Sequence, residues 1–370
     1  MATVYYDSSA TGANDGTSEA DAFTDLQTAY DSLTMGDHLY CKRAASREGV
    51  KTTNLTFSKT ATDTDSPMII EGYANTPGDG GMYQTASPVI MNGDYHIIKY
   101  FDVDKDDDND ACFYLTGDGH VAYRCIGRST YSYGRVFRLT MGSAIECAGY
   151  GAVRQGGNAI FDNGNRGSII NCYAEVQSAA ASAGSAIVCA SGFRPFSVVG
   201  CVCKNSSGTS GLEGIRLQSS PVRGGVVMNN TVEGFDTGIV FRDGSPASAD
   251  QSVIAYGNVV YNAADGIKNN QGTYTGTLGL VSIQNAFGLI TSAQTTAITD
   301  FDPITLTESP FVDTTDYQLN NAPGGGALLK GKLGIPDSQD PSKLTSLVRT
   351  DFQTHGGVAP NPVGEVSRSF

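Results

Sequence analysis

The sequence has no tryptophan, and only 17% of its 370 residues are charged. Without tryptophan a long groove that stacks sugar rings is less expected, although 18 tyrosines can fill the same role. The formal net charge of −14 argues against nucleic-acid binding, because phosphates are neutralised by clusters of Lys and Arg. No run of about 18 apolar residues occurs, so no membrane-spanning helix is predicted.

The hallmarks of secreted proteins and of metal enzymes are also missing. Residues 1–7 contain neither the basic region nor the apolar run of a secretory signal, so we expect synthesis in a host cytoplasm. None of the eight cysteines forms a C-x-x-C pair and the four histidines are scattered, which predicts neither a zinc cluster nor a catalytic triad. The thiols of a protein made in the cytoplasm are expected to stay reduced.

What the sequence does contain is a repeat of short apolar phrases. With 45 glycines and 40% apolar residues, the composition is that of a β-rich chain with many turns. In the first phrase a small residue precedes an apolar one, and a second apolar residue follows two positions later. Its copies occupy residues 111–115, 135–139, 158–162, 185–189, 213–217, 237–241 and 265–269. Their central residues are 23 to 28 positions apart.

A second phrase lies between copies of the first. It occupies residues 121–125, 144–147, 169–172, 198–201, 226–230 and 253–258. Apolar residues alternate within each phrase, which is typical of a strand with one face inward and one outward. Each repeat therefore carries at least two strands, joined by turns rich in Gly, Asn and Ser.

This repeat predicts an all-β fold, a single right-handed parallel β-helix. One coil cannot bury its own apolar face, but stacked coils share a core and pair their backbones. At about 4.8 Å per coil, equivalent residues lie directly above one another. We expect one internal apolar ladder and one of cysteines that gives way to asparagine. The first contains Phe113, Phe137, Ile160, Ile187, Ile215, Ile239 and Ile267, and the second contains Cys125, Cys147, Cys172, Cys201, Asn230 and Asn258.

The two ends of the chain differ from the repeat. Residues 1–45 read as an N-terminal cap, with an amphipathic helix near 21–33, because an uncovered coil would expose its core and its strand edge. Residues 46–335 form the β-helix. Residues 336–370 are polar and repeat-free, and we expect an extended arm that docks on a partner or a neighbouring subunit.

Segments at both ends carry a family resemblance. Residues 5–18, 22–29 and 36–40 resemble the opening of right-handed β-helix repeat proteins of the pectate-lyase-like, polysaccharide-active superfamily. Residues 309–313, 316–319 and 327–331 resemble the closing coil of the same proteins. The resemblance implies the fold over about 1–335, and a function among lyases, hydrolases and non-catalytic virion proteins. No catalytic motif of a particular lyase family is found.

The outward positions of the first phrase supply the candidate catalytic residues. Glu213 and Asp265 fall two coils apart, about 9–10 Å, near the upper end of the carboxylate separation in inverting glycosidases. Asp243 lies just past the strand between them. The alternative is that Glu213 pairs with Arg216, and Asp265 with Lys268, as surface salt bridges.

The densest acidic run supplies the candidate metal ligands. Asp104, Asp106 and Asp108 alternate within residues 102–110, and hard oxygen ligands at such positions suit Ca²⁺. The run lacks the Gly and the closing Glu of an EF-hand loop. A solvated acidic turn is the other reading, and no further cofactor is predicted.

Three functions remain open. The first is a structural protein of a tailed-phage virion, in a capsid-decorating or tail-associated position, whose partners are other virion proteins or its own subunits. For this role the resemblance implies a homotrimer. The second is a depolymerase, a hydrolase or lyase acting on bacterial surface polysaccharide through Glu213 and Asp265. The third is a glycan-binding module without turnover.

Overall fold

The structure is a computed structural model that divides into two units, residues 1–305 and 306–370. It describes residues 2–47, 54–60, 66–105, 111–130, 135–153, 159–164, 167–179, 184–190, 196–218, 223–242, 251–270, 278–294, 298–312, 317 and 319–332. The predicted arm, 336–370, lies outside these residues. Among the residues described, no helix is long and apolar enough to cross a membrane.

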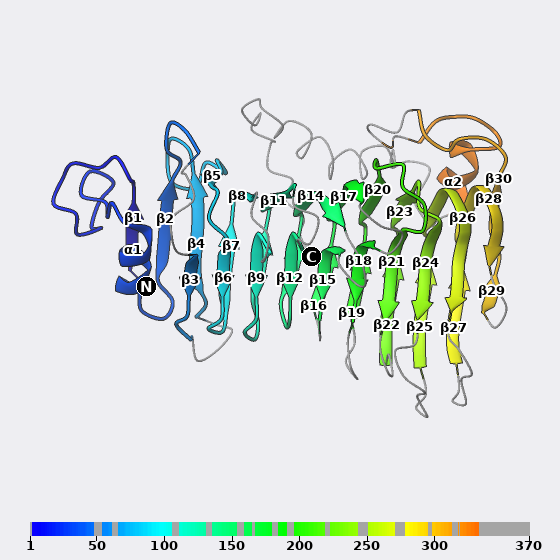
Figure 1. Cartoon of the computed structure of the whole chain (residues 1–370), viewed down its shortest axis with the longest axis horizontal. Helices are drawn as coiled ribbons and strands as arrows, with labels where there is room; N and C mark the ends of the chain where they lie inside the picture. Colours follow the sequence, from blue (N-terminus) through cyan, green and yellow to red (C-terminus); the bar gives the residue numbers. More distant parts are fainter. Residues whose placement is uncertain are drawn as a thin grey trace. The chain divides into compact units, whose positions relative to one another are not determined.

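The first unit is the predicted right-handed parallel β-helix. Figure 1 shows its strands side by side, one coil after another. Every named strand pairing that builds it is parallel, and between residues 90 and 285 every described element is a strand. One 12-stranded sheet, sheet A, takes one strand from each coil. Its strands are β1 (Thr3–Tyr6), β2 (His38–Lys42), β4 (Met68–Tyr73), β7 (His96–Lys99), β10 (Val121–Tyr123), β13 (Ser143–Ile145), β16 (Gly167–Ile170), β19 (Phe196–Val199), β22 (Arg223–Met228), β25 (Gln251–Tyr256), β27 (Leu278–Ile283) and β29 (Thr299–Phe301).

After each sheet A strand from β4 to β22 the chain turns and forms two further strands, here called the first and second B strands. The first B strands are β5 (Tyr83–Thr85), β8 (Phe101–Lys105), β11 (Ile126–Ser129), β14 (Ala148–Val153), β17 (Tyr173–Ala179), β20 (Val202–Asn205) and β23 (Thr231–Glu233). The second B strands are β3 (Leu55–Phe57), β6 (Val89–Met91), β9 (Phe113–Leu115), β12 (Phe137–Leu139), β15 (Ala159–Asn163), β18 (Ser185–Cys189), β21 (Glu213–Gln218) and β24 (Thr237–Arg242). Two long strands, β26 (Val259–Asn270) and β28 (Ala286–Gln294), run through both positions, and the remaining elements are α1 (Leu26–Ser32), β30 (Ile304–Leu306) and α2 (Gly326–Lys332).

The predicted apolar ladder is confirmed except at one rung. Phe137 pairs with Phe161, and Phe161 pairs with Ile187, so Ile160 is not in this ladder. The rings of Phe113, Phe137 and Phe161 stack, with centroids 4.7 and 4.6 Å apart. Stacking three aromatic rings favours this register over the one that places Ile160 beneath Phe137.

Ile160 belongs instead to a ladder one residue earlier, which is also buried. Its members are Cys112, Val136, Ile160, Ala186, Gly214, Gly238 and Gly266. They face a ladder on the first B strands formed by Val103, Gly127, Gly149, Ala174, Cys203, Val232, Val260 and Phe287. Large residues of one ladder meet glycines of the other: a Cβ on Gly127 would lie 2.3 Å from Val136, and one on Gly214 would lie 2.2 Å from Val232. The packed volume of the core thus stays similar from coil to coil, although the larger side chains lie on the second B strands in the earlier coils and on the first B strands in the later ones.

The turn between sheet A and the first B strands uses a left-handed residue in successive coils, for example Asn171 at φ 52° and Asn229 at φ 55°. The predicted cysteine and asparagine ladder follows this turn directly, is buried, and continues to Asn285. The thiol of Cys172 donates to the carbonyl of Ala144 in the preceding coil at 3.4 Å. The amide of Asn258 donates to the equivalent carbonyl of Val227 at 2.9 Å. The cysteines are therefore hydrogen-bonding groups as well as small buried side chains.

The N-terminal cap is present, but its helix is shorter than predicted. Helix α1 begins after Asp25, whose carboxylate accepts a hydrogen bond from the Thr28 N–H at 2.8 Å and so caps it. Upstream, Phe23 forms a parallel β-bridge with Tyr6, which holds residues before the cap in an extended conformation. Leu26, Ala29 and Tyr30 of α1 are buried and cover the first coils.

Candidate functional site

The outer side of the second B strands carries the predicted catalytic residues. In β21 both Gly214 and Ile215 face the core, because a Cβ on Gly214 would meet Val232 and Ile215 is fully buried in the core cluster. Two consecutive inward residues bend the strand. Glu213 and Arg216 therefore both point outward and lie three residues apart on one surface.

Glu213 and Arg216 form an ion pair, as the salt-bridge alternative predicts. The pair is not on a solvated surface, however, because its side chains are only 6% and 3% exposed. Val188 and Val240 flank Arg216 in the neighbouring coils, and both are buried. Glu213 lies between Ser185 and Thr237, and the Ser185 hydroxyl donates to its carboxylate at 3.4 Å. The pair is thus buried between neighbouring coils, which corrects the expectation of an exposed column.

Asp265 has the same local arrangement with more exposure. Lys268 donates to its carboxylate at 2.7 Å, and the side chains are 22% and 36% exposed. The register Glu213–Thr237–Asp265 places the two carboxylates two coils apart, as predicted. Asp243 lies outside the described residues. The structure thus brings Glu213 and Asp265 to one face and gives each a cation on its own strand.

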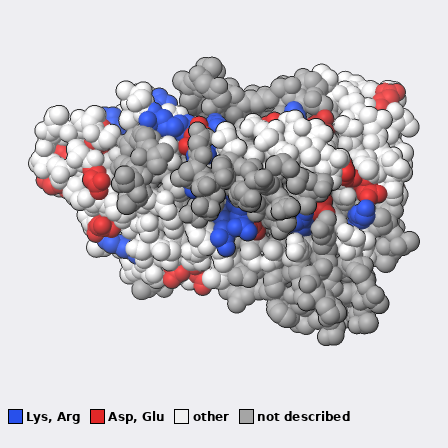
Figure 2. Space-filling view, in the orientation of Figure 1, with Lys and Arg blue, Asp and Glu red and all other residues white. Residues whose placement is uncertain are grey.

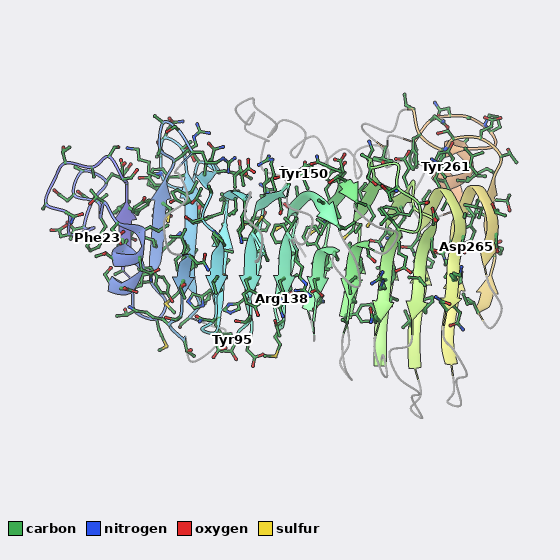
Figure 3. The ribbon with its side chains drawn as sticks, viewed as in Figure 1. Phe23, Tyr95, Arg138, Tyr150, Tyr261 and Asp265 are labelled. Carbon is green, nitrogen blue, oxygen red and sulfur yellow. The ribbon has the colours of Figure 1, made fainter. Side chains whose placement is uncertain are left out.

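A third charged group on this face was missed from the sequence. Asp162 of β15 pairs with Arg135, and Arg138 lies beside it in the adjacent coil. Burial raises the pKa of the Asp162 carboxyl, although Arg135 and Arg138 oppose the shift. Arg138, which is labelled in Figure 3, also lies over the ring of Tyr114, 4.6 Å from its centroid.

The one-residue register error explains this omission, because it placed Phe161 in the outward column instead of Asp162. The position expected for Asn158 is likewise taken by Ala159, which pairs with Ser185. Aligning residues 135–139 with 159–163, aromatic over aromatic, would have placed Asp162 correctly.

The predicted calcium ligands are described only in part. Asp104 Oδ2 lies 3.9 Å from Arg47 Nη2. The neighbouring Asp102 carboxylate is paired with both Arg47 and Arg128. Asp106 and Asp108 lie outside the described residues. Within the part of the chain that the structure describes, no group of three metal-ligating side chains occurs.

A polar cluster on the outer face of sheet A was not predicted from the sequence. His38 Nε2 lies 3.1 Å from Glu71 Oε2, and Lys99 Nζ lies 3.4 Å from the same oxygen. Burial alone would raise the pKa of Glu71, but the His38 hydrogen bond and the Lys99 charge outweigh it and lower the pKa. The sequence signal that could have revealed this cluster is the alternation of apolar and polar residues in 38–42, 68–73 and 96–99. These segments differ in sequence from the two repeated phrases of the later coils.

Comparison with known proteins supports the fold and leaves function open. No protein-family model and no curated protein matches the sequence. Among solved structures, the pectate lyase Pel9A matches with a TM-score of 0.59 and 14% identity, over 85% of this chain and 83% of that one. A rhamnogalacturonan lyase matches with a TM-score of 0.53 and 13% identity, over 88% and 94%. A tailspike protein of bacteriophage CBA120 matches with a TM-score of 0.23 and 12% identity, over 80% and 62%. The first two matches show that the chain shares the parallel β-helix fold of these two lyases.

Proposed function

We propose that this chain is a structural β-helix protein of a tailed-phage virion, made in the host cytoplasm, that contacts glycan without cleaving it. The observation that carries the proposal is the pairing of both expected catalytic carboxylates. Glu213 and Asp265 each bind a cation three residues away on the same strand, in the same geometry. A repeated ion pair of this kind suits a structural role on the strand surface. A catalytic acid–base pair instead needs two carboxyl groups in different protonation states.

The outer face of sheet A supports assembly with other subunits. From β13 to β27 one outward column is apolar in every coil, and all of its members are partly exposed. It consists of Ile145, Ile170, Val199, Met228, Tyr256 and Ile283. Beside it Ile254 is 46% exposed. A continuous apolar strip on a sheet is typical of a protein–protein contact, and a homotrimer is the assembly we propose.

Sedimentation velocity of the full chain tests this assembly. We expect an oligomer that dissociates when Val199→Asp or Ile254→Asp places a charge in the apolar strip. Leu289→Asp is the matched control, because Leu289 is 65% exposed in β28, at the left-handed corner between the first and second B positions, and not on sheet A. A monomeric wild-type protein, or variants that sediment as the control does, would reject it. Immunogold electron microscopy of native particles tests the virion location.

A polysaccharide depolymerase is the second candidate, and Asp162 is the observation that favours it. A carboxyl group with a raised pKa suits a general acid, and the adjacent Arg135 and Arg138 suit the carboxylates of an acidic polysaccharide. In this case Asp162→Asn should reduce turnover of polygalacturonate by orders of magnitude, while Glu146→Gln, which only removes the partner of Arg124, is the control. A wild-type protein that releases no product from acidic or neutral bacterial glycans excludes the candidate.

A further inference from the structure

In the first coils the outward column of sheet A has a different character from the apolar strip. The register aligns Tyr5, Tyr40, Glu71, Lys99 and Tyr123 in five successive coils. We call this column the tyrosine strip. All its members except Glu71 are partly exposed. At about 4.8 Å per coil it extends over about 19 Å.

Contacts within the sheet hold the tyrosine strip in place. The rings of Tyr5 and Tyr40 stack with centroids 5.9 Å apart, and His38 stacks on Tyr40 at 4.0 Å. Lys99 forms an ion pair with the Glu71 carboxylate. Arg124 lies 5.2 Å from the centroid of the Tyr123 ring. A ligand would meet side chains that are already ordered, so little conformational entropy is lost on binding.

The charges of this surface cancel. Glu71 is balanced by Lys99, and Arg124 forms an ion pair with Glu146 at 2.7 Å. On another face, shown in Figure 2, exposed basic and acidic side chains lie where Figure 3 labels Arg138 and Asp265. On the tyrosine strip, by contrast, neither a polyanion nor a polycation gains, because like and unlike charges are met equally. The expected ligand is therefore uncharged.

The shape of the surface indicates a linear polymer. The tyrosine strip runs along the solenoid axis on the face of a sheet. The backbone groups of β2 to β10 are paired with both neighbouring strands, and the outer edge of β1 is paired with Gly16 and Phe23. A peptide that adds as a β-strand needs a free edge, so this mode of recognition is unavailable there. Tyrosine combines an apolar ring with a hydroxyl group, and sugars combine apolar C–H faces with hydroxyl groups.

We propose that the tyrosine strip binds a neutral polysaccharide chain that lies along the solenoid axis. This inference names a surface and a glycan class for the glycan contact proposed above, and it rests on that part of the proposal. It places the contact on sheet A, away from the second B strands that carry Asp162, Glu213 and Asp265.

Affinity electrophoresis of the full chain in gels containing hydroxyethyl cellulose or dextran tests the inference, with polygalacturonate as the acidic comparison. Tyr5→Leu and Tyr123→Leu keep apolar bulk but remove ring and hydroxyl, so each should weaken binding to a neutral polymer about three- to tenfold. Tyr256→Leu is the matched control, since Tyr256 lies in the same column within the apolar strip, and its affinity should match wild type. Melting curves confirm that each variant folds.

The inference is overturned if neither neutral polymer is bound, or if binding survives both tyrosine substitutions. It is also overturned if polygalacturonate binds more tightly and Arg138→Ala abolishes that binding, which would place the glycan on the second B strands. Sedimentation of the same proteins reports assembly independently. An oligomer without neutral-glycan binding would leave the structural proposal standing and reject the tyrosine strip.

Discussion

The exchange of bulk between the two facing ladders can be tested by a double-mutant cycle at Gly127 and Val136. A Cβ at position 127 would lie 2.3 Å from Val136 Cγ1, and its next neighbours are Cys112 and Phe137 at 3.3 and 3.4 Å. The side chain of Val136 is therefore the main obstacle. Gly127 is not among the glycines with positive φ, so alanine suits its backbone. The cycle consists of Gly127→Ala, Val136→Ala and the double variant.

The expected magnitudes follow from packing. Gly127→Ala should destabilise by about 1–3 kcal/mol through overpacking, less about 0.4–1 kcal/mol from the lower entropy of the unfolded chain. Val136→Ala removes two buried methyl groups and leaves a cavity, which costs about 2–3 kcal/mol. In the double variant the new methyl group enters the space left by Val136. Its loss of stability should be about 1–3 kcal/mol smaller than the sum of the single losses.

Urea unfolding followed by circular dichroism measures the cycle, with equal m-values as the check that unfolding stays comparable. Gly127→Ala combined with Val227→Ala is the control, because Val227 is buried in sheet A several coils away and should be additive within about 0.5 kcal/mol. If the Gly127–Val136 pair is equally additive, the two ladders do not share volume and the packing argument fails.

Four further predictions concern buried polar and apolar groups. The rings of His96 and His120 are tilted against each other with centroids 5.3 Å apart, and burial lowers the pKa of each to about 4. The folded state then binds fewer protons than the unfolded state, whose His pKa is about 6.5, so stability is full above about pH 6.5 and falls towards pH 4, by up to about 3 kcal/mol per histidine. Melting temperatures independent of pH over this range would contradict it. Cys172→Asn should preserve stability better than Cys172→Ala, which loses the hydrogen bond to Ala144 at a cost of about 1–3 kcal/mol, and thiol titration of the unfolded protein should find most of the eight cysteines free. Ile215→Ala should cost about 2–5 kcal/mol in the same urea assay, and a small loss would place Ile215 outside the core.

The sequence predicts the solenoid because its signal is repeated. Seven copies of one phrase and six of another indicate the same coil, so a single misleading residue has little influence on the fold. No such redundancy fixes the register within a single coil. In the coil that contains residues 158–163, the register depends on whether Ile160 or Phe161 is placed in the apolar ladder. Both are apolar and both are buried, so periodicity alone does not choose between them. The aromatic stack with Phe137 decides in favour of Phe161.

The candidate site was less predictable than the fold for two physical reasons. Outward positions were equated with solvent, yet Glu213 and Arg216 point outward and are buried. Their neighbours belong to other coils and come into contact only after stacking: Val188 and Val240 flank Arg216, and Ser185 and Thr237 flank Glu213. The cluster around Glu71 was missed because His38, Glu71 and Lys99 come from three different coils. The strands of these first coils do not follow the sequence pattern of the later repeat, so their register was not predicted.

The burial of the Glu213–Arg216 pair changes how its substitution must be read. On a solvated face Glu213→Gln would be nearly neutral, whereas here it leaves the Arg216 guanidinium buried without its counter-charge, which costs about 3–5 kcal/mol. Loss of activity or assembly in this variant would therefore be ambiguous. Asp265→Asn is the cleaner test of a catalytic role, because its pair with Lys268 is partly exposed and worth far less.

The change from cysteine to asparagine along the buried ladder shows how one geometric task admits different chemistry. At this position a side chain must follow a left-handed turn, fit the core, and donate to a carbonyl of the preceding coil. Cys201 donates through sulfur to Ile169, and Asn230 donates through nitrogen to Val198. The backbone N–H of Cys201 also donates to the Asn230 side chain at 2.8 Å, so the two chemistries join within one continuous ladder. Burial raises the pKa of Cys125 and Cys172, which keeps these thiols protonated and able to donate. The switch in residue type therefore marks no domain boundary, and a solenoid can lose sequence similarity between its coils while each coil still meets the same hydrogen-bonding requirement.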